Sequence, residues 1–154
     1  MAATHLQPLS ADEEAAWRAL AHALIVLPRA LDAELVAGHG MSLSEYGVLV
    51  QLSEVPHRQL RMSELASMSS FTPAGMTRIV DRLVAQGFVE RRKCAADGRG
   101  SFAVLTDAGF RHLETAYPAH LASVRRHVMD HIDPGDLDAF MRIMSKVSES
   151  ACRG

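Results

Sequence analysis

The sequence predicts a mainly helical fold of the α+β class with one small β-hairpin, and three features indicate it. Leucine, alanine, valine and methionine supply most of the apolar volume while aromatic residues make up only 5% of the chain, a balance that favours helices. Apolar residues recur at helical spacing near both ends, and one pair of short alternating segments lies between them. With 154 residues, the chain suits one domain, or a compact domain with an appended assembly element.

The first helix is expected to begin after Ser10, because Ser10-Ala-Asp-Glu13 has the form of a capping box. An apolar stripe with intervals of three and four residues then predicts a helix of about 25 residues. The stripe consists of Trp17, Leu20, Leu24, Leu27, Leu31 and Leu35. Pro28 lies inside it and predicts a kink or a break, and Gly38 and Gly40 are expected to end the helix.

A second capping box, Ser42-Leu-Ser-Glu45, opens the next helix, and Pro56 marks its exit. Residues 59–62 are expected to form a short strand, followed by a short helix over 63–68. The expected core residues of these two helices are Tyr46, Leu49, Val50, Leu52, Leu65, Ala66 and Met68.

Thr72 followed by Pro73 predicts the start of another helix, because proline lacks an amide that would be unpaired there. Apolar residues at i, i+3, i+4 and i+7 define its buried face. They are Met76, Ile79, Val80 and Leu83. Gly87 is expected to close this helix.

Residues 88–94 and 101–105 are expected to pair as a hairpin, with Phe102 and Val104 on one face. Thr106-Asp107 caps a long helix that should reach about residue 131, with Pro118 a bend. Asp133-Pro134 caps a final helix, whose apolar residues are Leu137, Phe140, Met141, Met144 and Val147. The terminal helices are too long to be covered by the central module, so we expect them to bury their stripes against each other and a second copy of the chain.

Positive charge is concentrated in the middle of the chain, although the net charge is −2. Residues 61–100 contain seven cations and four anions, a net of +3, and the remainder contains nine cations and fourteen anions, a net of −5. A central basic module between acidic flanks suggests a nucleic-acid-binding surface, and an ordinary solvated surface is the alternative.

A short helix, a turn and a longer second helix over 63–86 follow the order used to read the DNA major groove. On the second helix, Ala74 and Gly75 allow close approach, Thr77 can contact a base edge, and Arg78 can bind guanine. Ser69, Ser70 and Thr72 precede the helix or cap its N-terminus, where amides and the helix dipole favour phosphate. The alternative is an ordinary helical hairpin with a polar outer face.

A two-stranded ribbon directly after the second helix is the wing of a winged helix, and its tip is Asp97-Gly98-Arg99-Gly100. Arginine suits the narrow, strongly negative minor groove, and the flanking glycines let the backbone approach phosphates. Arg82 and Arg91 are further expected DNA contacts. The alternative is a surface Asp-Gly turn.

Residues 61–109 closely resemble the core of the MarR family of bacterial winged helix-turn-helix transcriptional regulators. The matching pieces are Ser63-Glu-Leu-Ala66, Thr77-Arg-Ile-Val-Asp-Arg-Leu83, Gly87-Phe-Val-Glu-Arg-Arg92, Asp97-x-Arg99 and Leu105-Thr-Asp-Ala-Gly109. The resemblance implies a homodimer that binds a pseudo-palindromic operator on double-stranded DNA and, in most members, releases it on meeting a small ligand or an oxidant. Many members carry a second arginine at the position of Gly98. We therefore expect a more flexible wing in this chain, with one fewer groove or phosphate contact.

The expected organisation is a winged helix-turn-helix module over 43–105, with a helical dimerisation region formed by 10–40 and 106–152. The expected function is a transcriptional regulator, most simply a repressor, that needs no cofactor. In the MarR family, effector pockets lie where the winged helix-turn-helix module meets the dimerisation helices. Trp17, His22, His39 and Tyr46 are therefore candidate contacts for a small-molecule effector, and core or surface placement is the alternative.

Two other sensing schemes stay open from the sequence. Cys94 follows three cations that favour a thiolate and thus a redox switch, although a buried thiol also fits. His127 and His131 lie four residues apart and could share a metal with His120, Asp130 or Asp133, although two histidines without a firm third ligand more simply form a solvated helix face. No metal site is therefore expected.

Other functional classes find less support. No nucleophilic triad, phosphate loop or carboxylate pair in a catalytic frame is present, so the chain is not expected to be an enzyme. A helical interaction module without DNA binding is the remaining alternative. It gives no role to Arg99 at the tip of the expected wing. Acidic residues 12–14, the lack of a bilayer-spanning apolar run and only two cysteines indicate a soluble cytoplasmic protein without a membrane partner.

Overall fold

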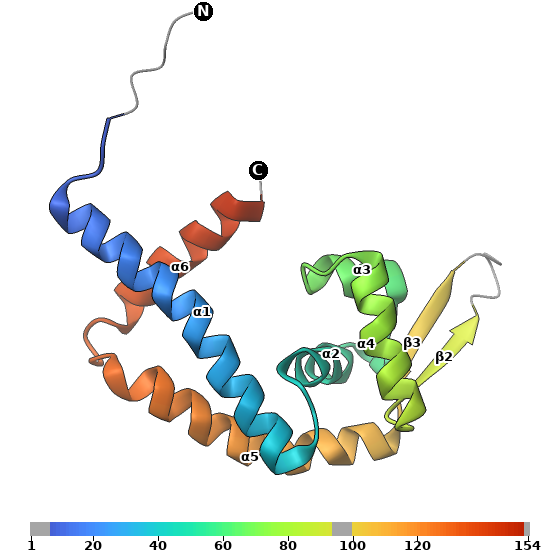
Figure 1. The fold of residues 1–154 in the computed structure, drawn as a ribbon. Helices are drawn as coiled ribbons and strands as arrows, with labels where there is room; N and C mark the ends of the chain where they lie inside the picture. Colours follow the sequence, from blue (N-terminus) through green and yellow to red (C-terminus); the bar gives the residue numbers. More distant parts are fainter. Residues whose placement is uncertain (1–6, 94–99, 153–154) are drawn as a thin grey trace, which may run out of the picture.

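The computed structural model describes residues 7–93 and 100–152. It is mostly helical, with a small antiparallel sheet, as the sequence predicts (Figure 1). The elements in chain order are α1 (Ala11–His39), α2 (Leu43–Ser53), a 3-10 turn η1 (Pro56–Arg58), β1 (Gln59–Arg61), α3 (Met62–Met68), α4 (Pro73–Ala85), β2 (Val89–Lys93), β3 (Ser101–Leu105), α5 (Asp107–His127), a 3-10 turn η2 (Met129–His131) and α6 (Leu137–Cys152).

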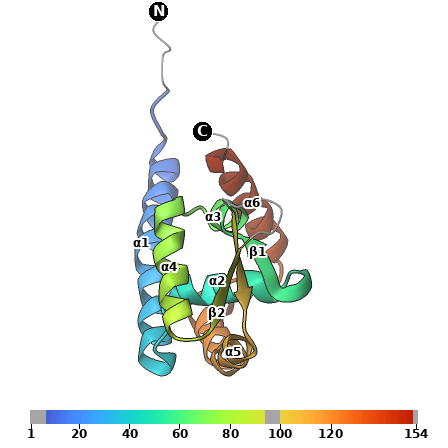
Figure 2. The ribbon, with the colours of Figure 1, turned by 90° about the vertical axis from the view of Figure 1, so that its right-hand side faces the viewer.

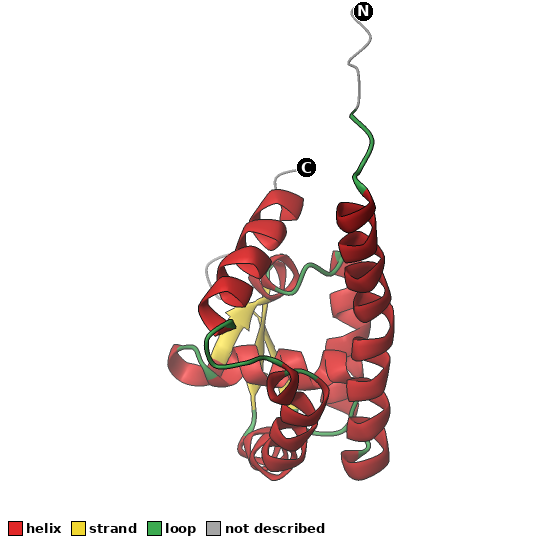
Figure 3. Ribbon diagram, turned by 90° about the vertical axis from the view of Figure 1, so that its left-hand side faces the viewer, coloured by secondary structure: helices red, strands yellow, loops and turns green. Residues whose placement is uncertain are grey.

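The elements form two regions. Elements α2 to β3 make a lobe, whereas α1, α5 and α6 make a helical frame. Helix α5 leaves the lobe beneath the strands and packs against the C-terminal part of α1 (Figure 1). In the frame, α1 and α6 project beyond the lobe in the same direction (Figure 3).

Capping residues set the helix starts as expected. Ser10 and Ser42 each accept a hydrogen bond from the backbone of the glutamate three residues on and complete a capping box, so α1 and α2 begin where the sequence indicates. Of the kink or break predicted at Pro28, the break does not occur, because α1 continues from Ala11 to His39 with Pro28 inside it. A proline removes only one backbone hydrogen bond, so a helix of 29 residues can continue through it.

The core lies in the lobe and its contacts with α1 and α5. The predicted inward face of α4 is buried throughout, with Met76, Val80 and Leu83 fully inaccessible to solvent. The prediction was wrong for Met68, which is 56% exposed. Because α3 has only seven residues, Leu65 and Ala66 fill its contact with the core, while Met68 sits at its outer end.

The predicted hairpin is part of a three-stranded antiparallel sheet in the order β1-β3-β2. The short strand at 59–61 supplies the third member, pairing Leu60 with Ala103 of β3. Ala103 and Leu105 face the core, whereas Phe102 and Val104 share the opposite face, as predicted by their alternation. The sheet thereby fixes the base of the hairpin against the lobe.

The C-terminal part differs from expectation in two boundaries. Helix α5 ends at His127, and η2 follows before α6 begins at Leu137 rather than at Asp133-Pro134. A turn in which the Asp136 amide donates to the Asp133 carbonyl (2.9 Å) occupies the intervening residues. Many large apolar side chains in the frame are exposed: Trp17, Leu24, Ile25, Val26, Leu137, Phe140, Met141, Ile143 and Val147. Among them lies an apolar hollow of about 590 Å³, lined by α1, by His127, Val128 and Ile132 around the end of α5, and by Phe140 and Met144 of α6.

Candidate nucleic-acid interface

The exposed face of α4 carries the side chains expected to read bases. Ala74, Thr77 and Arg78 are exposed, directly opposite the buried stripe. Thr72 Oγ1 accepts a hydrogen bond from the Gly75 amide at 3.1 Å, which caps the helix. A Cβ on Gly75 would lie 3.1 Å from that same oxygen, so the missing side chain leaves room for the cap. Figure 2 views the molecule with α4 and the hairpin strands toward the reader.

The three hydroxyls expected to bind phosphate are not equivalent. Ser69 Oγ donates within the protein, lying 2.8 Å from both Leu65 O and Gln51 Oε1, so it ties the α3–α4 turn to α2. Thr72 serves as the N-cap of α4. Ser70 is exposed, has a left-handed backbone (φ +54°), and has a side chain with no hydrogen bond to the described residues.

Two of the arginines expected at DNA make ion pairs within the lobe. Arg91 Nη2 lies 2.9 Å from Asp81 Oδ1 and joins β2 to α4. Arg82 Nε lies 3.1 Å from Glu45 Oε1 and joins α4 to α2. Arg78, by contrast, is exposed and forms no ion pair with residues 7–93 or 100–152. Arg99, Asp97 and Gly98 of the expected wing tip lie outside the described residues, as does Cys94.

A hollow of about 370 Å³ with polar side chains in its lining lies between the start of α4, the start of α3 and the tip-side end of β3. Its lining brings together the hydroxyl side chains of Ser63, Thr77 and Ser101 with the guanidinium-bearing Arg61. Hydroxyl donors around a cation are suited to a phosphate oxygen. Sequence reasoning did not single out Arg61 or Ser63 as members of this surface, although Arg61 belongs to the basic module.

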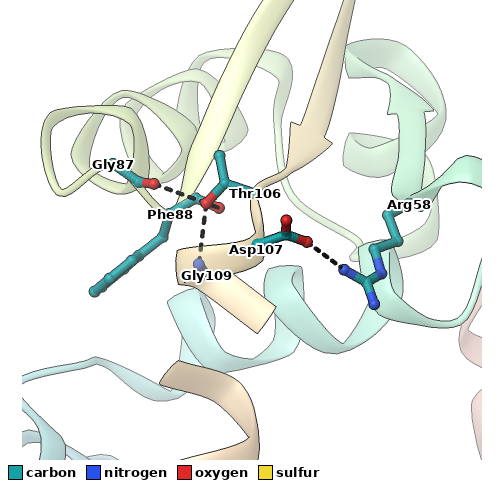
Figure 4. A network of polar contacts seen from close by, with 6 residues as sticks. All are labelled: Arg58, Gly87, Phe88, Thr106, Asp107 and Gly109. Atoms are coloured by element: carbon teal, nitrogen blue, oxygen red, sulfur yellow. Dashed lines mark hydrogen bonds and ion pairs between the residues drawn. The ribbon is translucent and has the colours of Figure 1, made fainter. Parts of the chain in front are cut away.

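The base of the hairpin is locked to α4 and α5 around Thr106 (Figure 4). Thr106 Oγ1 lies 2.8 Å from Gly87 O and 3.1 Å from Phe88 O, and it accepts from the Gly109 amide at 3.0 Å. A Cβ on Gly109 would lie only 2.2 Å from Phe88 O. The Leu105-Thr-Asp-Ala-Gly109 motif thus allows α5 to begin directly against the end of α4.

Arg58 reinforces this junction from the other side of α5. Its Nη1 lies 3.2 Å from Asp107 Oδ1 (Figure 4), and its guanidinium lies 3.9 Å from the centre of the Phe110 ring. The first turn of α5 is therefore held by contacts from both η1 and the Gly87-Phe88 turn.

The four expected effector residues do not come together. Trp17 and His22 are exposed on the N-terminal half of α1. His39 lies near His112, with ring centres 6.5 Å apart. Tyr46 is buried in α2 and contacts the ring of His120 at 4.3 Å.

Tyr46 is the one candidate that lines a sizeable hollow between lobe and frame. This α2–α5 pocket, of about 620 Å³, is lined by Tyr46, Val50, Ser53, Glu54, Leu113, Glu114, Tyr117 and His120. Burial, with a smaller contribution from Tyr117, raises the pKa of Tyr46, and burial lowers the pKa of His120. Both groups are therefore favoured in their neutral forms. Tyr117 was missed because it lies apart from the predicted stripes.

His127 contacts a carboxylate rather than a metal site. Its Nε2 lies 2.9 Å from Glu34 Oε1, and Arg126 Nη2 lies 2.6 Å from Glu34 Oε2, which joins α5 to α1. Ser123, His127 and Arg126 lower the pKa of Glu34 to about 2. Because the Ser123 hydroxyl does not reach hydrogen-bond geometry with any described partner, we attribute most of this lowering to His127 and Arg126. Within the described ranges, no three His, Cys, Asp or Glu side chains form a group that could hold a metal.

None of the helices in the described part of the chain combines the length and hydropathy required to cross a bilayer.

Comparison with known proteins identifies the family. The model of the MarR family matches residues 39–100. Over 113 residues, the chain is 31% identical to the HTH-type transcriptional repressor YetL of Bacillus subtilis (strain 168), covering 73% of this chain and 67% of that protein. The residues that the family model matches include the basic module at 61–100.

Solved structures extend the similarity to almost the whole chain. Sco3205 from Streptomyces coelicolor, a MarR family transcriptional regulator solved in complex with DNA, has 38% identity and a TM-score of 0.90, covering 94% of this chain and 91% of that one. AbsC, a MarR family transcriptional regulator from the same organism, has 31% identity and a TM-score of 0.90, covering 97% and 100%. These relatives are regulators rather than enzymes, in agreement with the sequence. The chain belongs to the MarR family of transcriptional regulators.

Proposed function

We propose that this chain represses transcription by binding double-stranded DNA as a homodimer, with α4 of each copy in the major groove. The exposed Ala74-Thr77-Arg78 face of α4, opposite a fully buried stripe, is the observation that carries this proposal. Small and hydroxyl side chains allow close approach, and Arg78, which makes no ion pair with the described residues, is available for guanine. That Sco3205 was solved with DNA and that YetL is a repressor support the same function.

Phosphate contacts would come from the edges of this face. Ser70 and the polar hollow lined by Arg61, Ser63 and Ser101 flank the start of α4, and Arg99 at the wing tip would reach the minor groove. Such contacts position the protein, whereas α4 supplies sequence specificity.

The frame is proposed to form the dimer. Exposed apolar side chains on α1 and α6 surround the 590 Å³ hollow, and apolar patches of this kind are typical of protein–protein interfaces. On this proposal, residues 43–105 read DNA while residues 10–40 and 106–152 assemble the dimer. The two α4 helices would then enter successive major grooves about 34 Å apart on a pseudo-palindromic operator.

A small-molecule effector would act at the α2–α5 pocket. The pocket lies where the lobe meets the frame, and its volume of about 620 Å³ falls within the usual range for drug-sized ligands. A molecule bound there would contact both regions and change the angle between them.

The test is selection of bound DNA from a random pool by the purified full-length chain, followed by titration at several salt concentrations. A pseudo-palindromic site should emerge, and log K should fall by about 0.9 for each phosphate contact per log unit of salt. Light scattering should give a dimer. Recovery of no preferred sequence, or binding that does not depend on salt, would refute the proposal.

A further inference from the structure

The N-terminus of α2 connects the frame to α4 through charged groups. From α1, Asp32 Oδ1 accepts a hydrogen bond from the Leu43 amide at 2.8 Å. From α4, Arg82 pairs with Glu45, in the first turn of α2. We call Asp32, Ser42, Glu45 and Arg82 the α1–α2–α4 tether.

Glu45 is the centre of the tether and uses both carboxylate oxygens. Its Oε2 accepts from the Ser42 amide at 2.8 Å and from Ser42 Oγ at 2.9 Å, while Oε1 faces Arg82 Nε at 3.1 Å. The residue is only 5% exposed. A buried carboxylate is costly unless it is paired and hydrogen-bonded, so Glu45 has little freedom to leave this position.

The ion pair adds a charged contact between α4 and α2 to the apolar contacts that hold α4. Met76, Ile79, Val80 and Leu83 pack α4 on the core, and the Arg82–Glu45 ion pair, with Nε 3.1 Å from Oε1, links the same helix to the first turn of α2. This link constrains the position of α4 on α2, and the hydrogen bond that Asp32 accepts from the Leu43 amide joins α2 to α1.

We infer that Arg82 is a positioning residue that sets the angle of the DNA-reading helix relative to the frame, and that it is not a phosphate contact. This inference rests on the proposed DNA binding. It replaces the sequence-based expectation that Arg82 contacts DNA directly. The Arg82 side chain is 60% exposed, so direct phosphate contact is the competing interpretation that an experiment must separate.

The two interpretations predict opposite effects for Glu45→Gln. Glutamine can complete a capping box as glutamate does, so this variant removes the charge pair while keeping the helix start. If Arg82 positions α4, Glu45→Gln should weaken operator binding about tenfold, like Arg82→Gln, because coupled pairs typically contribute on this scale. If Arg82 binds phosphate, Glu45→Gln frees it, and affinity should stay the same or rise.

Operator affinity and its salt dependence are measured for the wild type, both single variants and the double variant. If Arg82 positions α4, the salt slope of operator binding should be the same in all four proteins. The double variant should bind the operator no more weakly than either single variant. Glu14→Gln breaks a surface ion pair with Arg18 on α1 and is the matched control, with affinity expected within twofold of the wild type. Thermal melting of each variant verifies that it is folded.

Two results would overturn the inference. One is a salt slope that falls by about 0.9 per lost contact in Arg82→Gln together with unchanged or tighter binding by Glu45→Gln. The other is unchanged affinity in both variants. Failure of the wild type to bind any selected DNA would instead refute the proposed function, so the two failures are distinguishable.

Discussion

The lobe and the frame use apolar residues in different ways. In the lobe, the apolar stripe of α4 is fully covered, and Leu83 has no exposed surface. In the frame, α1 and α6 leave Leu24 and Met141 more than 60% exposed. The difference indicates that the lobe is held by a buried core, to which α1 and α5 add Leu35, Leu113 and Ala116, whereas the exposed side chains of α1 and α6 are the ones that the proposed dimer would cover. Mutations should therefore affect folding in the first region and assembly in the second.

The largest effect is expected from truncating the lobe core. Leu83→Ala removes a fully buried side chain and should lower the free energy of unfolding by about 2–5 kcal/mol. Val84→Ala, on the partly exposed side of the same helix, should cost less than about 1 kcal/mol. Denaturant unfolding followed by circular dichroism measures both. Equal losses of stability in the two variants would show that the buried face of α4 does not stabilise the lobe more than its exposed face does.

A matched pair of methionines separates assembly from folding. Met141 in α6 is 61% exposed and Met68 in the lobe is 56% exposed. Met141→Ser should weaken the dimer about tenfold or more, because a methionine buried in the interface contributes on this scale. Met68→Ser should leave the dimer unchanged. Sedimentation at a series of concentrations reports the dissociation constant, and the reverse order would contradict the assignment of the frame to assembly.

Removing a cation should weaken DNA binding only where the cation lies on the lobe. Arg78→Gln should reduce operator affinity, and if Arg78 also neutralises a phosphate the salt slope should fall by about 0.9 per contact. Arg125→Gln removes an exposed cation from α5 and should change neither quantity. Fluorescence anisotropy with labelled operator at several salt concentrations tests both. Similar losses in the two variants would point to a general charge effect rather than an interface.

The smallest effect concerns an ion pair inside the frame. The pKa of Glu34 is lowered from 4.5 to about 2, so its contribution to stability is present above pH 4.5 and is lost as the pH falls towards 2. Glu34→Gln should therefore flatten the acid side of the stability curve between these values and leave the lobe unaffected. Melting temperatures measured from pH 2 to 6 test this, with Glu114→Gln as a control. Parallel curves for the wild type and Glu34→Gln would contradict it.

Local sequence patterns predicted most of the fold, because caps and periodicity depend on neighbouring residues. Thr72-Pro73 predicted the start of α4, and the spacing of Met76 to Leu83 predicted its buried face. Patterns could not predict which partner a polar side chain would choose. Ser69 bonds Gln51 and Arg82 pairs with Glu45, and these choices depend on how α2 packs against distant segments. The spacing of apolar residues identified the polar face of α4. It could not separate the polar residues of α4 that face solvent from those that pair with α2.

The joint around Gly109 has a mechanical consequence. With the Phe88 carbonyl only 2.2 Å from where a Cβ would stand and Thr106 bonded to both flanking segments, this point has no room to act as a hinge. In the proposed dimer, these contacts would make the end of α4, the base of the hairpin and the first turn of α5 move as one rigid unit. A change in the distance between the α4 helices of the two copies would then have to originate farther along α5 or between the copies, so α4 and the hairpin would leave DNA together.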